Sequence, residues 1–112
     1  MDLSLCMIVK DETRYLADCV ASVRDLVRQV VIVDTGSTDG TAALARDLAD
    51  VFAQVSFDGD FSAARNAALA RADGDWVLFL DADDRLNYEG VLRIVDLAKS
   101  NVEDLKIEFI TH

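Results

Sequence analysis

The sequence contains no proline and only five glycines, so the few positions at which a helix or strand can break are informative. Its two cysteines are too few for a disulfide scaffold. Cys6 and Cys19 both lie in apolar segments, which predicts reduced cysteines in the core. The single histidine is the last residue, His112, so this sequence supplies neither a Ser/His/Asp nucleophile set nor a Cys/His metal site.

Basic residues are also scarce. The chain has 11 Lys and Arg against 21 Asp and Glu, which gives a net charge of −10. It has no basic cluster that could release counterions from a nucleic acid or an anionic membrane, so we expect neither as a partner. An anionic ligand would need a metal cation between it and the carboxylates.

Long hydrophobic runs are missing as well. No stretch approaches the roughly 20 apolar residues of a membrane span, and the apolar segment 3–9 lacks the basic residues that begin a signal peptide. We therefore expect no membrane insertion and a cytoplasmic location.

A length of 112 residues allows one domain, residues 1–112, and 52% hydrophobic residues can supply its core. Short apolar or β-branched runs alternate with segments that have helical spacing or are rich in alanine. The predicted strands are 3–9, 30–33, 51–57, 76–80 and 106–111, and the predicted helices are 15–27, 42–49, 62–72 and 87–99. Asp11 or Thr13 is expected to cap the first helix, and at least one of Ser37, Thr38 and Asp39 the second.

This alternation is typical of βαβ units and predicts an α/β fold, a Rossmann-like three-layer αβα sandwich with a mostly parallel sheet. If the second and third strands wind outward from the first and the fourth returns to its other side, the strand order is 3-2-1-4. In open α/β sheets, ligands bind at the carboxyl ends of strands beside such a switch point.

Polar clusters follow the carboxyl end of each of the first four strands, whereas the amino ends are simpler. The clusters are 10–12, 34–39, 58–66 and 81–84. The carboxyl ends of parallel strands meet at one edge of a sheet, so this edge is predicted to hold the ligand.

Asp81 and Asp83 form a D-x-D pair at a strand end, with Cα atoms roughly 6.7 Å apart and both carboxylates able to face one ligand. Hard oxygen donors of this kind suit Mg²⁺ or Mn²⁺. The alternative is that Asp83 and Asp84 only stabilise the start of the following helix through its dipole.

Two further side chains are candidates for ligand contact. Asp34 ends a buried strand, where a carboxylate can accept a hydrogen bond from a ring N–H, and Gly36 would let a flat ligand approach the backbone. Arg65 could reach a phosphate or the Asp81 region as a permanent cation with a bidentate fork, although a solvated arginine is the simpler alternative.

Four segments in order resemble the amino-terminal half of a family 2 glycosyltransferase with the GT-A fold. They are LSLCMIVKDE at 3–12, VIVDTGSTDGT at 31–41, DFSAARN at 60–66 and GDWVLFLDADD at 74–84. That family binds a nucleotide-diphosphate sugar, here expected to be a UDP-sugar. The resemblance implies that the backbone at Val9 and the carboxylate of Glu12 border the base and ribose, and that Asp34 holds the base.

By the same resemblance, Arg65 would lie near the diphosphate or the sugar, and Asp81 would bind ribose or sugar hydroxyls. Asp83 would coordinate the Mg²⁺ or Mn²⁺ ion that bridges the diphosphate. Transfer to an acceptor hydroxyl, deprotonated by a carboxylate base, would then invert the anomeric carbon.

Family enzymes continue well beyond 112 residues, and no residue of this sequence matches their general base. We therefore expect a truncated, donor-binding part of the enzyme with little or no turnover by itself. The fifth strand would be the outermost strand of the sheet and would have an unpaired, exposed side. Pairing through it could form a homodimer.

Three other interpretations start from the same acidic clusters. Asp-nucleophile phosphatases also place D-x-D at a strand end, but on the first strand rather than the fourth. A phospho-acceptor receiver domain has the right size, and Asp58 would be its acceptor. The non-enzymatic alternative is a regulatory module that binds a nucleotide without chemistry.

Overall fold

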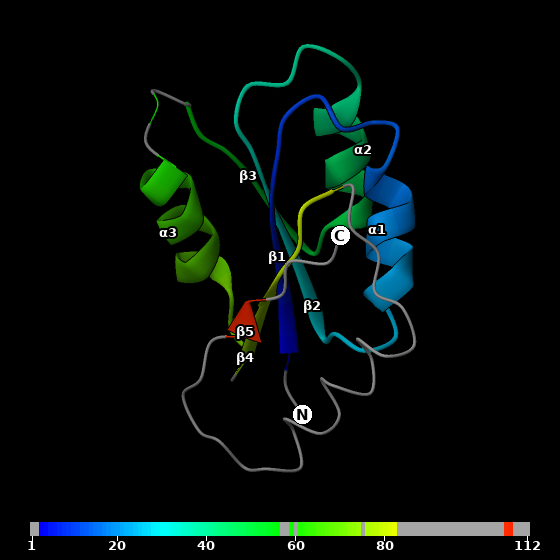
Figure 1. Cartoon of the computed structure of the whole chain (residues 1–112), viewed down its shortest axis with the longest axis vertical. Helices are drawn as coiled ribbons and strands as arrows, with labels where there is room; N and C mark the ends of the chain where they lie inside the picture. The colour runs from blue at the N-terminus through cyan, green and yellow to red at the C-terminus, as the bar shows by residue number, and fades with distance from the viewer. Residues whose placement is uncertain (1–2, 57–58, 60, 75, 83–106, 109–112) are drawn as a thin grey trace.

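The computed structural model of the chain describes residues 3–56, 59, 61–74, 76–82 and 107–108 (Figure 1). The strands are β1 (Leu3–Val9), β2 (Gln29–Asp34), β3 (Val51–Gln54), β4 (Trp76–Phe79) and β5 (Ile107–Glu108). The helices are α1 (Leu16–Val23), α2 (Thr41–Leu48) and α3 (Phe61–Arg71). Across these described residues, no helix has the length and apolar character needed to cross a bilayer.

All strand pairs in the sheet are parallel, and the order is β3-β2-β1-β4-β5. The predicted order 3-2-1-4 is therefore confirmed, and β5 is added beyond β4. β1 lies between β2 and β4, so the switch point falls where it was expected. A receiver domain has the order 2-1-3-4-5, and the observed order excludes that alternative.

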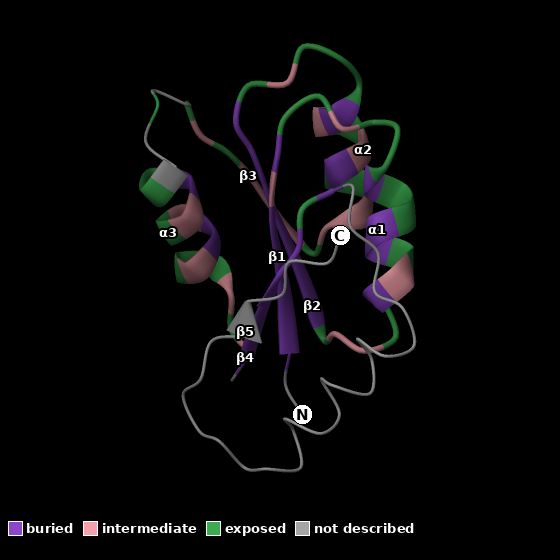
Figure 2. Ribbon diagram, in the orientation of Figure 1, coloured by how far each residue is buried: buried purple, intermediate pink, exposed green. Residues whose placement is uncertain are grey.

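Helices cover both faces of the sheet, which confirms the three-layer prediction (Figures 1 and 2). α1 and α2 pack on one face over an apolar cluster that includes Leu5 and Ile32. α3 packs on the other face over a smaller cluster that includes Val31 and Val77. Because both faces are covered, β1 and β2 are apolar almost throughout rather than alternating with polar residues.

The predicted core residues are found inside. Cys6 and Cys19 are buried free cysteines, and Trp76 is buried at the start of β4. Cys6 lies on the α3 side of the sheet and Cys19 on the α1 side, so the two thiols belong to different apolar clusters.

Some predicted boundaries were too long. α1 ends at Val23 rather than 27, although Leu26 and Val27 still pack against the core. β3 ends at Gln54, and β4 ends at Phe79. The predicted helix 87–99 lies outside the described residues.

The predicted cap of the first helix was wrong. Tyr15 is the N-cap of α1, and no side chain caps it. The side chains of Asp11 and Thr13 instead bond to the loop between β2 and α2. In that loop, the N–H groups of Thr38 and Asp39 donate to the Asp11 carboxylate, and the Asp39 carboxylate accepts from the Thr13 hydroxyl.

The start of the second helix agrees in part with the prediction. The N-cap position of α2 is Gly40, which has no side chain to offer. Asp39, one residue earlier, accepts a hydrogen bond from the Thr41 N–H at 2.8 Å, which satisfies one of the four free N–H groups of the first turn.

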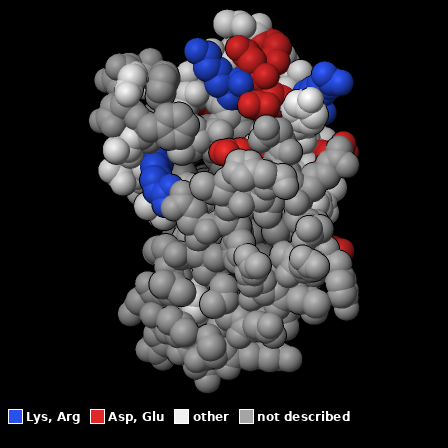
Figure 3. Space-filling model, in the orientation of Figure 1, with Lys and Arg blue, Asp and Glu red and all other residues white. Residues whose placement is uncertain are grey.

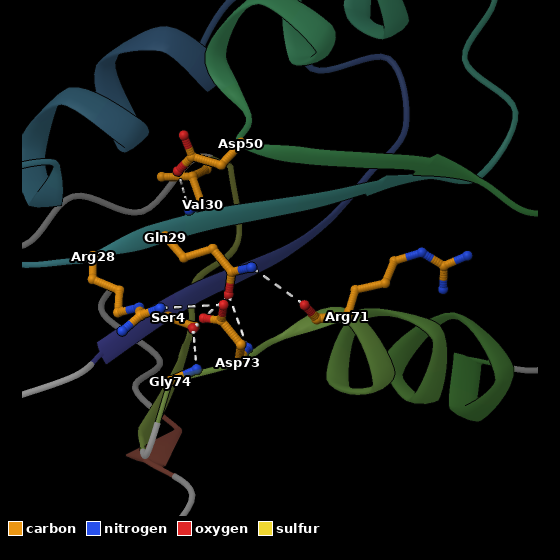
Figure 4. A network of polar contacts seen from close by, with 8 residues as sticks. All are labelled: Ser4, Arg28, Gln29, Val30, Asp50, Arg71, Asp73 and Gly74. Atoms are coloured by element: carbon orange, nitrogen blue, oxygen red, sulfur yellow. Dashed lines mark hydrogen bonds and ion pairs between the residues drawn. The ribbon is translucent and has the colours of Figure 1, made fainter.

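A buried polar network holds the α3–β4 connection at the amino end of the sheet (Figure 4). Gln29 Oε1 accepts hydrogen bonds from Ser4 Oγ at 2.7 Å and from the Asp73 N–H at 3.0 Å. Gln29 Nε2 donates to the carbonyl of Arg71 at 3.3 Å, and the Gly74 N–H donates to Ser4 Oγ at 2.9 Å. The amino end is therefore less simple than the sequence indicated.

A second contact at this end joins β2, α1 and β3. Asp50 accepts a hydrogen bond from the Val30 N–H at 2.8 Å and forms an ion pair with Arg24 at 3.1 Å. The Arg24 guanidinium, followed by the Val30 N–H, lowers the pKa of Asp50. These contacts fix the start of β3 against β2.

Replacing Gln29 with Ala should lower the free energy of unfolding by about 1–3 kcal/mol, because the buried Ser4 hydroxyl and Asp73 N–H lose their partner. Arg28→Ala should cost less than about 1 kcal/mol, since its ion pair with Asp73 is about half exposed at 51% and 56%. Urea unfolding of the chain measures both. Equal losses in the two variants would contradict the assignment of the network to Gln29.

Candidate functional site

The carboxyl ends of β2 and β4 meet on either side of β1. Asp34, the last residue of β2, pairs in register with Val9, the last residue of β1. On the other side, the Leu80 N–H donates to the Cys6 carbonyl at 3.4 Å, so the ladder continues past β4 as far as the residue before Asp81. Two strand spacings, about 10 Å, separate β2 from β4. The same edge of the sheet therefore holds Asp34 and Asp81, as predicted.

Asp34 is a buried carboxylate held by its own loop. It is 0% exposed, and Oδ2 accepts hydrogen bonds from the N–H groups of Gly36 and Ser37, each at 3.1 Å. Ser37 Oγ donates to Oδ1, and the side chain of Gln54 also bonds to the carboxylate. Burial by itself would raise the pKa of Asp34, but these hydrogen bonds outweigh it and lower the pKa. The charge is thus kept at the edge of the sheet.

Val9 is buried beside Asp34, and its carbonyl is already bonded. It accepts hydrogen bonds from the N–H of Thr35 at 3.0 Å and from Thr35 Oγ1 at 3.2 Å. These two bonds join the end of β1 to the loop after β2. A ligand at this edge would therefore meet a β1 end that is fixed before it arrives.

The β1–α1 loop and the β2–α2 loop lie side by side above the sheet and are joined by hydrogen bonds (Figure 1). Asp11 Oδ1 accepts from the Thr38 N–H at 2.7 Å, and the Asp11 N–H donates to Ser37 Oγ at 2.9 Å. Ser37 in turn donates to Asp34. Each loop thus supplies both a donor and an acceptor to the other.

Glu12 is held in the same way through its backbone. Its N–H donates to Thr41 Oγ1 at 2.8 Å, and Thr41 Oγ1 donates to Asp39. Thr13 Oγ1 also donates to Asp39, at 3.2 Å. The hydroxyl and N–H of Thr41, with Thr13, lower the pKa of Asp39, so this exposed carboxylate stays ionised at neutral pH.

Asp81 is exposed at the carboxyl side of β4. Its neighbours Leu80 and Ala82 belong to the apolar cluster under α1 and α2, although Asp81 itself does not. Its backbone carbonyl accepts a weak hydrogen bond from Cys19 Sγ of α1 at 3.4 Å. The backbone at Asp81 is therefore held against α1.

Arg65 is half-buried on α3, where its guanidinium carbon lies 4.2 Å from the centre of the Phe79 ring. Phe79 packs in the cluster under α3 and is two residues before Asp81. Because side chains two apart in an extended chain project to the same side, Arg65 and Asp81 share the α3 side of the sheet. Arg65 is therefore in contact with a ring and only partly exposed to solvent, and its contact with a ligand stays a prediction.

Acidic side chains gather at the end of the molecule where these loops lie, with basic side chains on both flanks (Figure 3). Within the part of the chain that the structure describes, no three Asp, Glu, Cys or His side chains come close enough to form a metal site. The predicted metal ligand Asp83 lies outside that part. Asp81, its described neighbour, is an exposed oxygen donor of the type that Mg²⁺ and Mn²⁺ prefer.

Sequence reasoning missed two features of this edge. It treated Asp11 as a helix cap, whereas Asp11 joins the two loops, and it did not assign Phe79 as the ring under Arg65. The first had a signal, since residues 35–41 are rich in side chains that bond to nearby backbone. The second had none, because periodicity does not fix which residue of a helix lies over which residue of a strand.

A parallel α/β sheet with polar loops at the carboxyl ends of its strands, beside a switch point, is an arrangement in which α/β proteins bind ligands. The model of the family described as glycosyl transferase family 2 matches residues 4–107, so the chain belongs to that family. This confirms the resemblance found in the sequence.

Two curated relatives match most of the chain, and one of them is named a glycosyltransferase. The chain is 49% identical over 87 residues to a TPR repeat-containing protein of Synechococcus elongatus, covering 78% of this chain and 22% of that protein. It is 32% identical over 97 residues to the SPbeta prophage-derived glycosyltransferase SunS of Bacillus subtilis, covering 83% and 22%. The chain thus spans about a fifth of the length of these relatives.

Solved structures share the fold. TarS residues 1–349 of S. aureus superimposes with a TM-score of 0.73 at 27% identity, covering 89% of this chain and 33% of that one. Glucosyl-3-phosphoglycerate synthase of Mycobacterium tuberculosis, in a complex with Mn²⁺, UDP and glucosyl-3-phosphoglycerate, has a TM-score of 0.63 at 21% identity, covering 75% and 35%. The fold is the GT-A fold, as the resemblance implied.

Replacing Asp34 with Asn should destabilise the chain by about 1–3 kcal/mol at pH 7. An amide has one acceptor oxygen in place of two, so its N–H₂ must face either the N–H donors of Gly36 and Ser37 or the Ser37 hydroxyl. The pKa of Asp34 is lower in the folded chain than in the unfolded one. Its stabilisation is therefore complete above about pH 4 and is lost as the pH falls through the folded value.

Urea unfolding of the natural chain and of Asp34→Asn between pH 3 and pH 7 measures this difference. The gap between the two chains should shrink as the solution becomes more acidic. Asp47→Asn, at an exposed position of α2, is the control and should show no such gap. A gap for Asp34→Asn that stays constant with pH would contradict the assignment.

Proposed function

We propose that residues 1–112 are the donor-binding domain of a glycosyltransferase and bind a nucleotide-diphosphate sugar at the carboxyl edge of the sheet. One observation carries the proposal. The parallel order brings Asp34 after β2, the 10–13 loop after β1 and Asp81 after β4 to a single edge beside the switch point. Membership of glycosyl transferase family 2 supports the same assignment.

The proposed donor lies across the sheet edge with its base towards β2. Asp34 would accept a hydrogen bond from a ring N–H of the base, and its low pKa keeps it an acceptor at neutral pH. Val9 and Glu12 would border the base and ribose. The hydrogen bonds that already hold their backbones would reduce the ordering needed on binding.

The diphosphate and sugar would lie towards β4 and α3. Arg65, held over Phe79, would place its cation near the diphosphate or the sugar, and Asp81 would accept hydrogen bonds from ribose or sugar hydroxyls. Asp83, two residues after Asp81, would hold a divalent cation, Mg²⁺ or Mn²⁺. When bound, such an ion offsets the charge of the diphosphate and stabilises it as a leaving group.

We propose inverting transfer of the sugar to an acceptor hydroxyl. No residue of the sequence matches the general base of the family, so we expect this chain alone to bind the donor with little or no turnover. Dimerisation through β5, the end of the sheet order, stays a prediction, as does a cytoplasmic location.

UDP and Mn²⁺ are the probes of choice, because the mycobacterial synthase with this fold was solved with both. The natural chain should bind UDP in calorimetric titration, and Mn²⁺ should strengthen the binding. Asp83→Ala should remove the metal dependence, whereas Asp47→Ala removes one negative charge from an exposed surface of α2 and should retain it. Absence of UDP binding by the natural chain, with or without Mn²⁺, would refute the proposal.

Two arginines of the chain lie over phenylalanine rings, which gives a matched pair of variants. Arg65 lies over Phe79 on the proposed ligand side, and Arg46 lies over Phe52 at 5.1 Å in the last turn of α2. Arg65→Gln should weaken UDP-sugar binding about tenfold or more, since a charge-assisted contact to phosphate is lost. Arg46→Gln should leave the affinity unchanged. Equal effects of the two variants on the dissociation constant would contradict the placement of Arg65.

A further inference from the structure

Asp11 has a backbone conformation that side chains rarely adopt. Its φ is 53°, in the left-handed region, and it is the one non-glycine residue with a positive φ among those that the structure describes. Asn and Asp tolerate this region better than other residues with a side chain. Residues in such rare backbone conformations cluster at active sites and ligand-binding sites. Asp11 lies two residues after Val9, the last residue of β1, at the proposed donor edge.

Hydrogen bonds to the Asp11 side chain accompany this backbone conformation. Its Oδ1 accepts hydrogen bonds from the N–H groups of Thr38 at 2.7 Å and Asp39 at 3.3 Å, and from Thr38 Oγ1 at 3.4 Å. One carboxylate oxygen thus gathers two successive backbone N–H groups of the β2–α2 loop. The Asp11 carboxylate thus satisfies N–H groups of the β2–α2 loop that a carbonyl of the loop's own backbone could otherwise accept.

A second contact leads from Asp11 to Asp34. The Asp11 N–H donates to Ser37 Oγ at 2.9 Å, which leaves the Ser37 hydroxyl proton for Asp34 Oδ1. The Ser37 N–H donates to the other oxygen of Asp34 at 3.1 Å. Asp11 therefore holds Ser37 and the two residues after it, and Ser37 holds both oxygens of Asp34.

We infer that Asp11 is a positioning residue, which fixes the β2–α2 loop so that Asp34 meets the base of the bound nucleoside diphosphate. This inference rests on the proposed donor site and goes beyond it, because Asp11 acts through Ser37 and the loop backbone. Asp11 should therefore affect the binding of the base. The diphosphate side, towards Arg65 and β4, does not depend on Asp11.

Three substitutions of Asp11 distinguish the effect of its backbone conformation from the effect of its carboxylate. Asp11→Gly permits the positive φ but removes the acceptor, Asp11→Asn keeps an acceptor oxygen and tolerates the same φ, and Asp11→Ala removes both. Asp47→Ala is the charge control on the exposed surface of α2. Each chain is titrated with UDP and, separately, with inorganic pyrophosphate, both in the presence of Mn²⁺.

The dissociation constant for UDP should rise about tenfold or more in Asp11→Gly and Asp11→Ala, since hydrogen bonds to a charged group are lost. Asp11→Asn should restore most of the affinity. The affinity for pyrophosphate, which has no base, should stay the same in all four variants. Hydrogen exchange at the Thr38 and Asp39 amides should be faster in Asp11→Gly and return towards the natural rate in Asp11→Asn.

The results distinguish this inference from the proposed function. If the natural chain binds UDP and Asp11→Gly binds it equally well, the positioning role is refuted and the donor site stands. An equal loss of UDP and pyrophosphate affinity would also refute it, because the effect would then be on the fold as a whole. If the natural chain binds no UDP, the proposed function fails and the role of Asp11 in binding fails with it.

Discussion

The hydrogen-bonded position of β1 between two parallel strands is the constraint on which the rest of the structure depends. Because β2 and β4 both run parallel to β1, the ends of all three strands come to one edge, and every crossover must return the chain to the opposite edge. Residues far apart in the sequence, such as Asp34 and Asp81, are therefore brought to the same edge of the sheet. The apolar composition of β1 and β2 makes this possible, since helices cover both faces of the sheet.

Buried polar groups are hydrogen-bonded in different ways at the amino ends and at the carboxyl ends of the strands. At the amino edge, Gln29 and Ser4 bond to backbone groups of the α3–β4 connection and leave a closed network. At the carboxyl edge, side chains of one loop bond to the backbone of the next, and a full negative charge is retained on Asp34. Burial of that charge is tolerated because N–H and hydroxyl donors surround it. The first arrangement stabilises the fold, and the second keeps a charged acceptor ready at the edge.

Much of this architecture could be predicted from the sequence. The β-branched run that ends at Asp34 and the apolar run before Asp81 indicate buried strands, and the alternation of elements predicts a parallel sheet. The strand order follows only on the condition that the second and third strands wind outward from the first. The capping of α1 could not be predicted, because the Asp11 carboxylate and the Thr13 hydroxyl have partners in the β2–α2 loop as well as in the helix, and only the tertiary structure decides between them. The stacking of Arg65 on Phe79 depends on how α3 lies across the sheet, which local patterns do not determine.

The most deeply buried side chains of α3 are the methyl groups of two alanines. Ala64 and Ala68 are both buried, and the Ala68 carbonyl is near enough to accept a weak hydrogen bond from Cys6 Sγ at 3.8 Å. Because these side chains are small, the helix can approach the strands closely. The position of the helix in turn determines the position of Arg65. The location of a cation at the rim is thus decided by residues that have no chemistry of their own. A bulkier side chain at Ala68 would displace that cation even in a chain that still folds.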